Sequence, residues 1–334
     1  MTQGCSHLAN DEPYLESKQF NRISASFHNS NGKENSKNFA ELFSFFVDFL
    51  LRPADPAETE GFPLNHEKRQ SKTSRPSLTW IGHSSLLVRI RGKTILTDPV
   101  FSKRASPFSL IGPRRIVPPA FALNELPEID FVVISHSHYD HLDLKTVRYL
   151  ATRNKTTTFF VPLGLKKLLE SVGATEVFEL DWWDQVQTDD LTFIATPAHH
   201  WSARTFFDRN KTLWSSWMIT SENFKFFFAG DTGYSSDFKE IKKNLGSPDV
   251  AAIPIGAYAP RAFMKGNHVN PTEAVNIFQD LQAKTAIAIH WGTFKLSTEP
   301  LREPPEKLRS ELERRNIKPD RFIILNHGET LIPD

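Results

Sequence analysis

The side chains best suited to chemistry lie in one short stretch, His136-Ser-His-Tyr-Asp-His141. It places three imidazoles and a carboxylate within six positions. His136 and His138 are two residues apart, so in an extended segment they point the same way and can share one metal ion. Asp140 and His141 follow in the turn and can face a second position nearby. Imidazole and carboxylate ligands without thiolate suit zinc, iron or manganese. We therefore interpret the stretch as a metal site rather than a chance histidine-rich loop.

Strands must position these groups. The short run of β-branched and aromatic residues at 131–134 directly precedes the histidine stretch and is typical of a buried strand. Three more apolar runs are each followed by a histidine or an aspartate: His199 and His200 after 191–195, Asp231 after 224–228, and His290 after 286–289. A lone histidine is more often structural than a ligand. The repeated placement at strand ends favours one shared site on a single rim of the fold.

From Leu78 onward, strand-like and helix-like runs alternate. We expect strands at residues 86–90, 94–96, 131–134, 158–161, 191–195, 214–219, 224–228, 250–255, 286–289 and 322–325, and helices at 163–171, 238–243, 271–281 and 304–315. The third helix has a clear start signal, with Asn270 as cap, Pro271 in the first turn and Glu273 three residues after the cap. Many strands with few interleaved helices favour two sheets covered outside by helices, rather than a doubly wound parallel sheet.

Composition narrows the classes of protein. The 334 residues are 39% hydrophobic and 24% charged, which is ordinary for a globular protein. A formal net charge of +1 argues against an electrostatically driven nucleic-acid binder. The single cysteine, Cys5, excludes an intramolecular disulfide framework and a cysteine-based zinc site. No apolar stretch is long enough to span a bilayer. We expect a soluble or peripheral membrane protein.

The N-terminal region differs in character, and we expect residues 1–75 to form a polar arm before a catalytic domain at 76–334. Residues 1–40 lack hydrophobic periodicity and should be loosely ordered. Residues 43–51 predict an amphipathic helix that packs on the main domain or, alternatively, lies on a membrane surface. Residues 53–74 are interpreted as a linker.

The first residues carry no apolar core of a signal peptide. The Gly4-Cys5 pair is nevertheless similar to the junction of a bacterial lipoprotein. The protein would be such a lipoprotein if its native start lay upstream of Met1.

The motifs together resemble the metallo-β-lactamase superfamily: His-x-His-x-Asp-His, a distant histidine, an aspartate in a Gly-Asp-Thr-Gly turn, and a final histidine. The sequence segments around these motifs resemble, more specifically, those of the N-acylphosphatidylethanolamine-hydrolysing phospholipase D family. They include Trp80-Ile-Gly-His-Ser84, Leu96-Thr-Asp-Pro99, Phe160-Val-Pro-Leu-Gly-Leu165, Glu179-Leu-Asp-Trp-Trp183, Ala252-Ile-Pro-Ile-Gly-Ala-Tyr258 and Ile289-His-Trp-Gly-Thr-Phe294. The similarity runs from about Trp80 to Glu329, and residues 1–75 carry no comparable match.

The resemblance implies an αββα sandwich that holds two zinc ions between its sheets. Carried over by position, one zinc takes His136, His138 and His200, the other takes Asp140, His141 and His290, and Asp231 bridges them. In the doublet, His200 is chosen over His199 because the family's ligand stands directly before a tryptophan, here Trp201. His83 lies in one of the segments that resemble the family, and we expect it to support the site without binding metal.

The activity implied is hydrolysis of N-acylphosphatidylethanolamine to N-acylethanolamine and phosphatidic acid. Two zinc ions that share a water lower its pKa, and the resulting hydroxide can attack phosphorus. Asp140 is a ligand first and can also orient the nucleophile, beside Asp231. His268 is expected to hydrogen-bond a phosphoryl oxygen or to protonate the leaving alkoxide. Tyr139 and Arg261 are further candidate phosphate contacts, with packing and ordinary solvent-facing charge as their alternatives.

Two other functions fit the same motifs. The first is a lactonase or phosphodiesterase acting on a small soluble substrate, because this superfamily uses one site for several hydrolyses. The second is a metal-stabilised scaffold without catalysis, which the complete ligand set disfavours. For the lipid enzyme, the expected partner is a phospholipid at a membrane surface, no nucleic acid is expected, and the resemblance suggests a homodimer.

Overall fold

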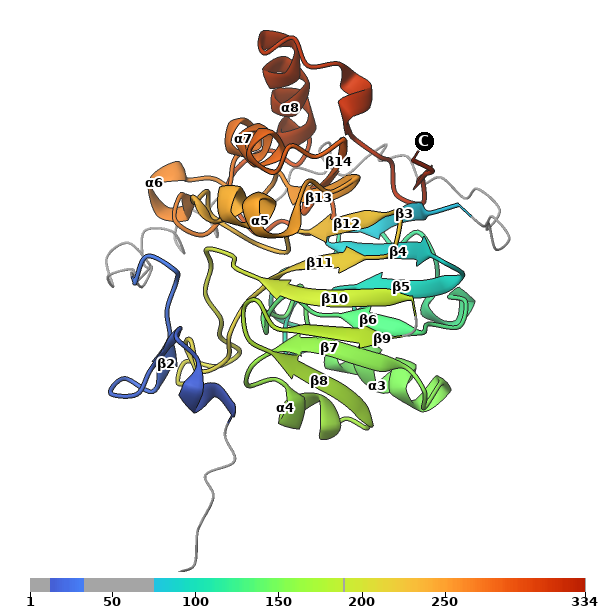
Figure 1. The fold of residues 1–334 in the computed structure, drawn as a ribbon, viewed down its shortest axis with the longest axis vertical. Helices are drawn as coiled ribbons and strands as arrows, with labels where there is room; N and C mark the ends of the chain where they lie inside the picture. The colour runs from blue at the N-terminus through green and yellow to red at the C-terminus, as the bar shows by residue number, and fades with distance from the viewer. Residues whose placement is uncertain (1–12, 33–74, 189, 334) are drawn as a thin grey trace, which may run out of the picture.

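The computed structural model describes residues 13–32, 75–188 and 190–333. Two seven-stranded sheets face each other, and helices cover their outer surfaces (Figure 1). This arrangement confirms the expected αββα sandwich and positions the strand ends that carry the histidines and aspartates. Within the described residues, no helix is both long enough and apolar enough to cross a membrane.

The first sheet has the strand order β16-β3-β4-β5-β6-β7-β8. Its strands are β3 (Ser77–Gly82), β4 (Ser85–Ile90), β5 (Lys93–Thr97), β6 (Phe131–Val133), β7 (Thr158–Pro162), β8 (Glu176–Leu180) and β16 (Thr330–Leu331). Strands β5 to β8 are parallel, and the others pair antiparallel. Helices α3 (Leu144–Arg153) and α4 (Lys166–Glu170) join the parallel strands β6, β7 and β8.

The second sheet has the order β15-β14-β13-β12-β11-β10-β9. Its strands are β9 (Gln185–Thr188), β10 (Leu191–Thr196), β11 (Ser216–Thr220), β12 (Lys225–Phe228), β13 (Val250–Pro254), β14 (Thr285–Ile289) and β15 (Phe322–Ile323). Strands β12 to β15 are parallel. The helices that follow its strands are α5 (Asp237–Leu245), α6 (Arg261–Met264), α7 (Pro271–Leu281) and α8 (Glu303–Arg314). Short 3₁₀ helices are η1 (Pro13–Glu16), η2 (Leu123–Glu125) and η3 (Pro319–Arg321).

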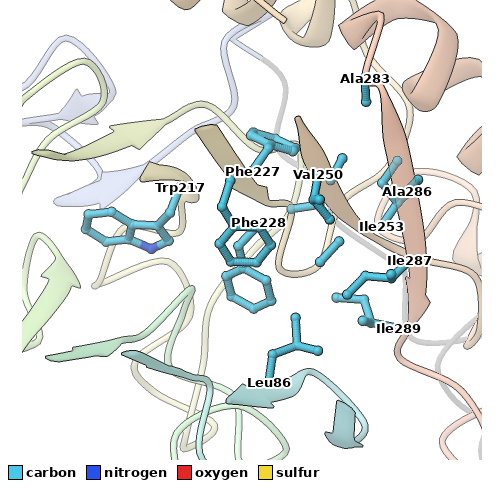
Figure 2. Packing of buried hydrophobic residues seen from close by; sticks show 14 of the residues in the cluster. Leu86, Trp217, Phe227, Phe228, Val250, Ile253, Ala283, Ala286, Ile287 and Ile289 are labelled. Atoms are coloured by element: carbon cyan, nitrogen blue, oxygen red, sulfur yellow. The ribbon is translucent and has the colours of Figure 1, made fainter. Parts of the chain in front are cut away.

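The main core lies between the sheets, where aromatic residues of the second sheet meet aliphatic residues of the first (Figure 2). Leu86 of β4 belongs to the same cluster as Trp217 and Phe228. The indole of Trp217 also donates a hydrogen bond to the carbonyl of Ile134, 2.9 Å away. This bond ties β11 to the segment that begins the histidine stretch. The core therefore fixes the two sheets relative to each other beneath the site.

Strand β6 is buried on both faces. Phe131 and Val133 belong to the core between the sheets, whereas Val132 packs with Val147 of α3 in a second cluster. A strand covered on both sides is apolar at every position, which explains the unbroken apolar run. The histidine stretch therefore starts from a rigidly held strand.

The sequence analysis located most elements and missed several. Helix α7 matches its expected bounds, and its Asn270 cap accepts a hydrogen bond from the Glu273 backbone. Strand β11 begins at 216 instead of 214, and α4 is shorter than expected. Strands β3, β8 and β9 and helices α3 and α6 were not expected. Strand β8 was missed because Glu176 and Glu179 interrupt its apolar residues, and charged residues of this kind are common in edge strands.

The sequence analysis expected residues 1–40 to be loosely ordered. This expectation is wrong for residues 13–32, which form regular structure. They form η1 and the paired strands β1 (Phe20–Asn21) and β2 (Ser26–Phe27). Phe27 is fully buried in a cluster with Trp182 and Trp214. Aromatic anchors therefore hold a polar segment on the sandwich. The helix expected at 43–51 and the linker at 53–74 lie outside the described residues, and the division at residue 75 stays a prediction.

Candidate metal centre

The seven predicted metal ligands meet at one edge of the sandwich. They follow the ends of four strands: the four ligands of the histidine stretch follow β6, His200 follows β10, Asp231 follows β12 and His290 follows β14. These loops bring together ligand atoms that lie within 4.8 Å of one another in each of several overlapping groups. The structure therefore brings together the residues that the sequence analysis placed at the strand ends.

The first group consists of His136, His138 and His200. The Nε2 atom of His136 lies 2.7 Å from Nδ1 of His138, and Nε2 of His200 lies 3.3 Å from the same Nδ1. Three imidazole nitrogens thus converge on one point. This is the number of protein ligands that a catalytic zinc uses when one position stays open.

The second group consists of Asp140, His141 and His290, together with His83. Oδ2 of Asp140 lies 3.3 Å from Nε2 of His141 and 3.4 Å from Nε2 of His290. The Nε2 atom of His83 is 3.0 Å from the same oxygen. His83 therefore holds the Asp140 carboxylate from beside the group, which agrees with the supporting role expected for it.

Asp231 lies between the two groups. Its Oδ2 is 3.1 Å from Nε2 of His141 and 3.8 Å from Nε2 of His200, and its Oδ1 is 3.1 Å from Nε2 of His290. The preceding Gly230 has a φ of +59°, and a side chain there would collide with Ser135. Only glycine allows this turn to approach the histidine stretch so closely.

Three residues in or beside the centre have a left-handed backbone conformation. His83, Asp98 and His290 have positive φ values of 55°, 33° and 59°. Non-glycine residues seldom adopt this region, and such outliers persist where surrounding contacts determine them.

The donor set fits a metal ion. Three atoms that face the centre are buried and have no hydrogen-bond partner: Nε2 of His141, Nε2 of His290 and Oδ1 of Asp231. Unsatisfied buried polar atoms are rare and costly, and a bound ion is one of the few explanations for several in one place. Their nitrogen and oxygen chemistry matches zinc and related divalent metals.

Both carboxylates of the centre are ionised. Burial opposes their charge, but His141 and His290 hold the pKa of Asp231 well below its usual range. His141, followed by His290 and His83, does the same for the pKa of Asp140 despite burial. Two buried negative charges surrounded by imidazoles form a preorganised cation site.

The imidazoles divide into two kinds. Burial lowers the pKa of His138 to about 4 and lowers the pKa values of His136 and His200 well below the usual range. These three are therefore neutral, as metal ligands must be. For His290, burial is outweighed by Asp231 and Asp140, which raise its pKa to about 9. Burial is likewise outweighed at His141, where Asp231, Asp140 and Asp98 raise the pKa well above its usual range. The metal-free chain thus holds protons on both His290 and His141 at neutral pH.

We expect zinc binding to metal-free protein to release a proton near neutral pH. The raised pKa keeps His290 protonated below about 9, and zinc can bind this nitrogen only after the proton leaves. Calorimetric titration in buffers of different ionisation enthalpy measures the release. It should be present at about pH 7 and decrease as the pH rises through about 9, where His290 loses its proton. The raised pKa of His141 should maintain part of the release above that pH. Equal heats in all buffers at about pH 7 would contradict this.

A second layer of groups orients the imidazoles. The Asp98 carboxylate lies 2.6 Å from Nδ1 of His141 and accepts hydrogen bonds from the backbone and hydroxyl of Ser135. The Ser135 hydroxyl lies 2.9 Å from Nδ1 of His136. Such carboxylate–histidine pairs fix the ring orientation of metal ligands. Sequence reasoning missed Asp98, although it follows β5 as the other site residues follow their strands.

The geometry separates the two histidines of the doublet. His200 points into the centre, and its Nδ1 lies 2.9 Å from the carbonyl of Asn267. His199 points elsewhere: its Nδ1 is 2.9 Å from the carbonyl of Gly266 and its Nε2 is 3.1 Å from Asn31. The choice of His200 as the candidate ligand therefore agrees with the directions of the side chains.

Asn29 of the N-terminal segment braces the His200 backbone. Its side-chain nitrogen donates to the carbonyl of His200 at 3.1 Å, and its oxygen accepts from the His200 N–H at 2.9 Å. The same oxygen accepts from the indole of Trp214 at 3.1 Å. Asn29 is 1% exposed. A residue far away in sequence thus fixes the loop that carries a candidate ligand.

We expect Asn29→Ala to weaken zinc binding about 10- to 100-fold, the range found when groups that orient a ligand are removed. The change leaves two backbone groups of His200 buried without a partner. Competition with a chromogenic chelator measures the affinity. The matched control is Asn21→Ala in the same segment, because Asn21 accepts only from the exposed backbone of Ile23 and Ser24. Equal affinities of the two variants would refute the bracing role.

A cavity of about 290 Å³ lies beside the centre. Asp140, Asp231 and His268 contribute its polar wall, and its apolar lining includes Trp201, Phe263, Met264 and Leu296. Tyr139 also lines it, while its hydroxyl donates to the carbonyl of Arg204 at 2.9 Å. The candidate centre therefore adjoins a mainly apolar space.

The predicted substrate residues occupy different positions. His268 lies close to the centre, with Nδ1 3.8 Å from Oδ2 of Asp231. Arg261 forms an ion pair with Glu273 and donates to the carbonyl of His268 at 2.6 Å. It thus supports the backbone of His268, and its direct contact with substrate stays a prediction.

Comparison with known proteins identifies the family. A model described as the β-lactamase superfamily domain matches residues 93–291. The chain belongs to the metallo-β-lactamase superfamily. The fold agrees with this: the metallo-β-lactamase fold protein YhfI from Bacillus subtilis superimposes with a TM-score of 0.55 at 15% identity, covering 77% of this chain and 99% of that one.

Two relatives give a narrower placement. A protein of Caenorhabditis elegans named N-acyl-phosphatidylethanolamine-hydrolyzing phospholipase D 1 is 37% identical, covering 97% of this chain and 96% of its own. An uncharacterized protein of Mycobacterium tuberculosis is 42% identical over 73% of this chain and 66% of its own. The resemblance to the phospholipase D family is confirmed. With the buried ligand cluster, these relationships make the chain a metal-dependent hydrolase.

Proposed function

We propose that this protein is a dinuclear zinc phospholipase D that hydrolyses N-acylphosphatidylethanolamine to N-acylethanolamine and phosphatidic acid. The observation that carries the proposal is the apolar cavity joined to two ligand groups that share Asp231. A small polar pocket would have argued against a lipid substrate. The name of the Caenorhabditis elegans relative, aligned over almost the whole chain, supports the same substrate.

The reaction requires water to attack phosphorus and the bond from phosphorus to the ethanolamine oxygen to break, with a proton passing to that oxygen. Bound zinc ions supply an acidified water and neutralise negative charge on the phosphoryl oxygens. His136, His138 and His200 would hold one ion. Asp140, His141 and His290 would hold the other, with Asp231 shared between them.

His268 is placed to contact the phosphate. It lines the cavity, and burial lowers its pKa to about 4, so its ring is neutral at neutral pH. A neutral imidazole can donate one hydrogen bond to a phosphoryl oxygen but holds no spare proton for a leaving alkoxide. Of the two roles expected for His268, this environment favours the hydrogen bond.

The competing candidate is hydrolysis of a small soluble phosphodiester or lactone at the same centre. The likeness to solved structures under 25% identity shows the fold alone and leaves this open. The apolar lining of the cavity favours the lipid because the side chains of Phe263 and Leu296 offer no hydrogen-bonding group to a polar substrate.

The deciding experiment measures metal content and turnover of N-acylphosphatidylethanolamine in the same preparations. We expect about two zinc ions per chain and release of N-acylethanolamine. Turnover should disappear after chelation and return when zinc is added. Two zinc ions with turnover only of soluble phosphodiesters or lactones would transfer the function to the competing candidate. Full turnover in metal-free protein would refute both.

A further inference from the structure

Two loops beside the cavity expose large apolar side chains. We call them the 104–114 hairpin and the 203–212 loop. Phe108, Leu110 and Ile111 on the hairpin are 63%, 83% and 70% exposed. Phe206 and Phe207 on the other loop are 100% and 91% exposed. Five of the eight exposed large hydrophobic residues in the described part of the chain therefore lie on these two loops.

The exposure is built into the loops. At the base of the hairpin, Arg104 and Arg114 form a β-bridge, and the Ala105 N–H donates to the carbonyl of Pro113. Arg104 also donates to the carbonyl of Gly112 at 2.7 Å. These contacts close the hairpin and project its tip. Apolar side chains that a closed hairpin holds in solvent indicate a surface that a binding partner covers.

The 203–212 loop is closed in a similar way. The Asp208 carboxylate accepts hydrogen bonds from the backbone N–H groups of Arg204 and Thr205, at 3.0 and 2.7 Å. This turn places Phe206 and Phe207 between its ends and directs them to solvent.

Both loops border the cavity of the candidate centre. Ala105 and Pro113 line it from the hairpin, and Trp201, two residues before the 203–212 loop, lines it as well. Tyr139 joins the two: its ring packs with the cluster that contains Ala105, and the guanidinium of Arg204 lies 4.0 Å above its centroid. The two apolar tips therefore belong to the same region as the candidate site.

The surrounding charge is positive. The sequence from 99 to 124 contains four basic residues and no acidic one, and the sequence from 201 to 212 contains three basic residues and one acidic residue. The whole chain has a net charge of only +1. Lys103 and Arg114 are exposed, and Lys211 is exposed while it donates to backbone carbonyls of the N-terminal segment. Positive charge is thus concentrated around the apolar tips.

We infer that the 104–114 hairpin and the 203–212 loop form a docking surface for an anionic phospholipid bilayer. Apolar tips that enter the headgroup region, with basic residues beside anionic headgroups, are the two components of interfacial binding. The basic excess favours an anionic bilayer over a second copy of this nearly neutral chain. The inference rests on the proposed function in one respect, which is that docking would bring the cavity to its lipid substrate.

Binding to vesicles that contain no substrate tests the surface directly. Flotation compares the unmodified chain with Phe206→Ser/Phe207→Ser and Leu110→Ser/Ile111→Ser on vesicles of phosphatidylcholine plus phosphatidylserine. Each pair should lower partitioning about tenfold or more, because two apolar contacts with the bilayer are lost. The control is Phe178→Ser, which removes a 40% exposed phenylalanine from β8, outside both loops. Thermal unfolding and zinc content confirm that each variant is folded.

The outcomes separate the explanations. Weakened binding of both loop pairs with an unaffected control supports the surface, and weaker binding to phosphatidylcholine alone or in high salt supports its anionic preference. Unchanged binding of both pairs overturns the inference. The inference is also overturned if the unmodified chain does not bind vesicles but forms a dimer, and the substitutions in the loops dissociate that dimer. If the chain docks but never hydrolyses N-acylphosphatidylethanolamine, the proposed function fails and the docking surface stands.

Discussion

Replacing His200 by alanine is expected to lower turnover by more than about a hundredfold and to reduce the zinc content below that of the unmodified chain. Removing a group that merely orients a ligand already costs about 10- to 100-fold, so removing the ligand itself should cost more. His200 lies in one group with His136 and His138, and its Nε2 is also 3.8 Å from Asp231. Its loss leaves two imidazoles in the first group.

The adjacent residue is the matched control. His199→Ala makes the same change on the same loop, but His199 contacts the carbonyl of Gly266 and Asn31 instead of the centre. We expect it to keep both the zinc content and most of the turnover. Metal analysis and kinetics on the two variants decide which of the two histidines binds zinc. A reversed outcome, with zinc lost from His199→Ala and kept in His200→Ala, would show that the ligand assignment is wrong.

Much of the candidate site could be predicted from the sequence because its side chains follow strands. An apolar strand buried on both faces has a clear signature, and β6 shows it immediately before the histidine stretch. The ligand types then stand directly after β6, β12 and β14, where parallel strands end at the same edge of a sandwich. The spacing of two residues between His136 and His138 gave their common direction correctly.

What escaped prediction depends on contacts between distant segments. Asp98 is one carboxylate among many until the fold places it 2.6 Å from His141. Asn29 lies 171 positions from His200, and its two hydrogen bonds with that residue are made with backbone atoms. Because every residue has these backbone atoms, no sequence pattern indicates such a contact. The polar composition of the N-terminal segment also concealed its aromatic anchors, such as Phe27.

The second large effect is expected from Asp231→Asn. The replacement keeps the size of the side chain and removes its negative charge. Asp231 lies 3.8 Å from Nε2 of His200 in the first group and 3.1 Å from Nε2 of His290 in the second, so it is the carboxylate that the two ligand groups share. An amide cannot neutralise two divalent ions at once, and the charge that raises the pKa of His290 also disappears. We expect the variant to bind fewer than two zinc ions per chain and to lose turnover by more than about a hundredfold.

The fall in zinc content separates this role from a purely structural one. Asp249→Asn provides the control, since Asp249 accepts from the Lys225 backbone and pairs with Lys284 outside the candidate centre. That variant should retain its zinc and its turnover, whatever it loses in thermal stability. Because Asp231 belongs to both groups, its loss should weaken both ions, whereas loss of His200 should weaken chiefly the first. Zinc titrations of the two variants compared side by side should therefore differ in the number of affected sites, and identical titrations would refute a shared carboxylate.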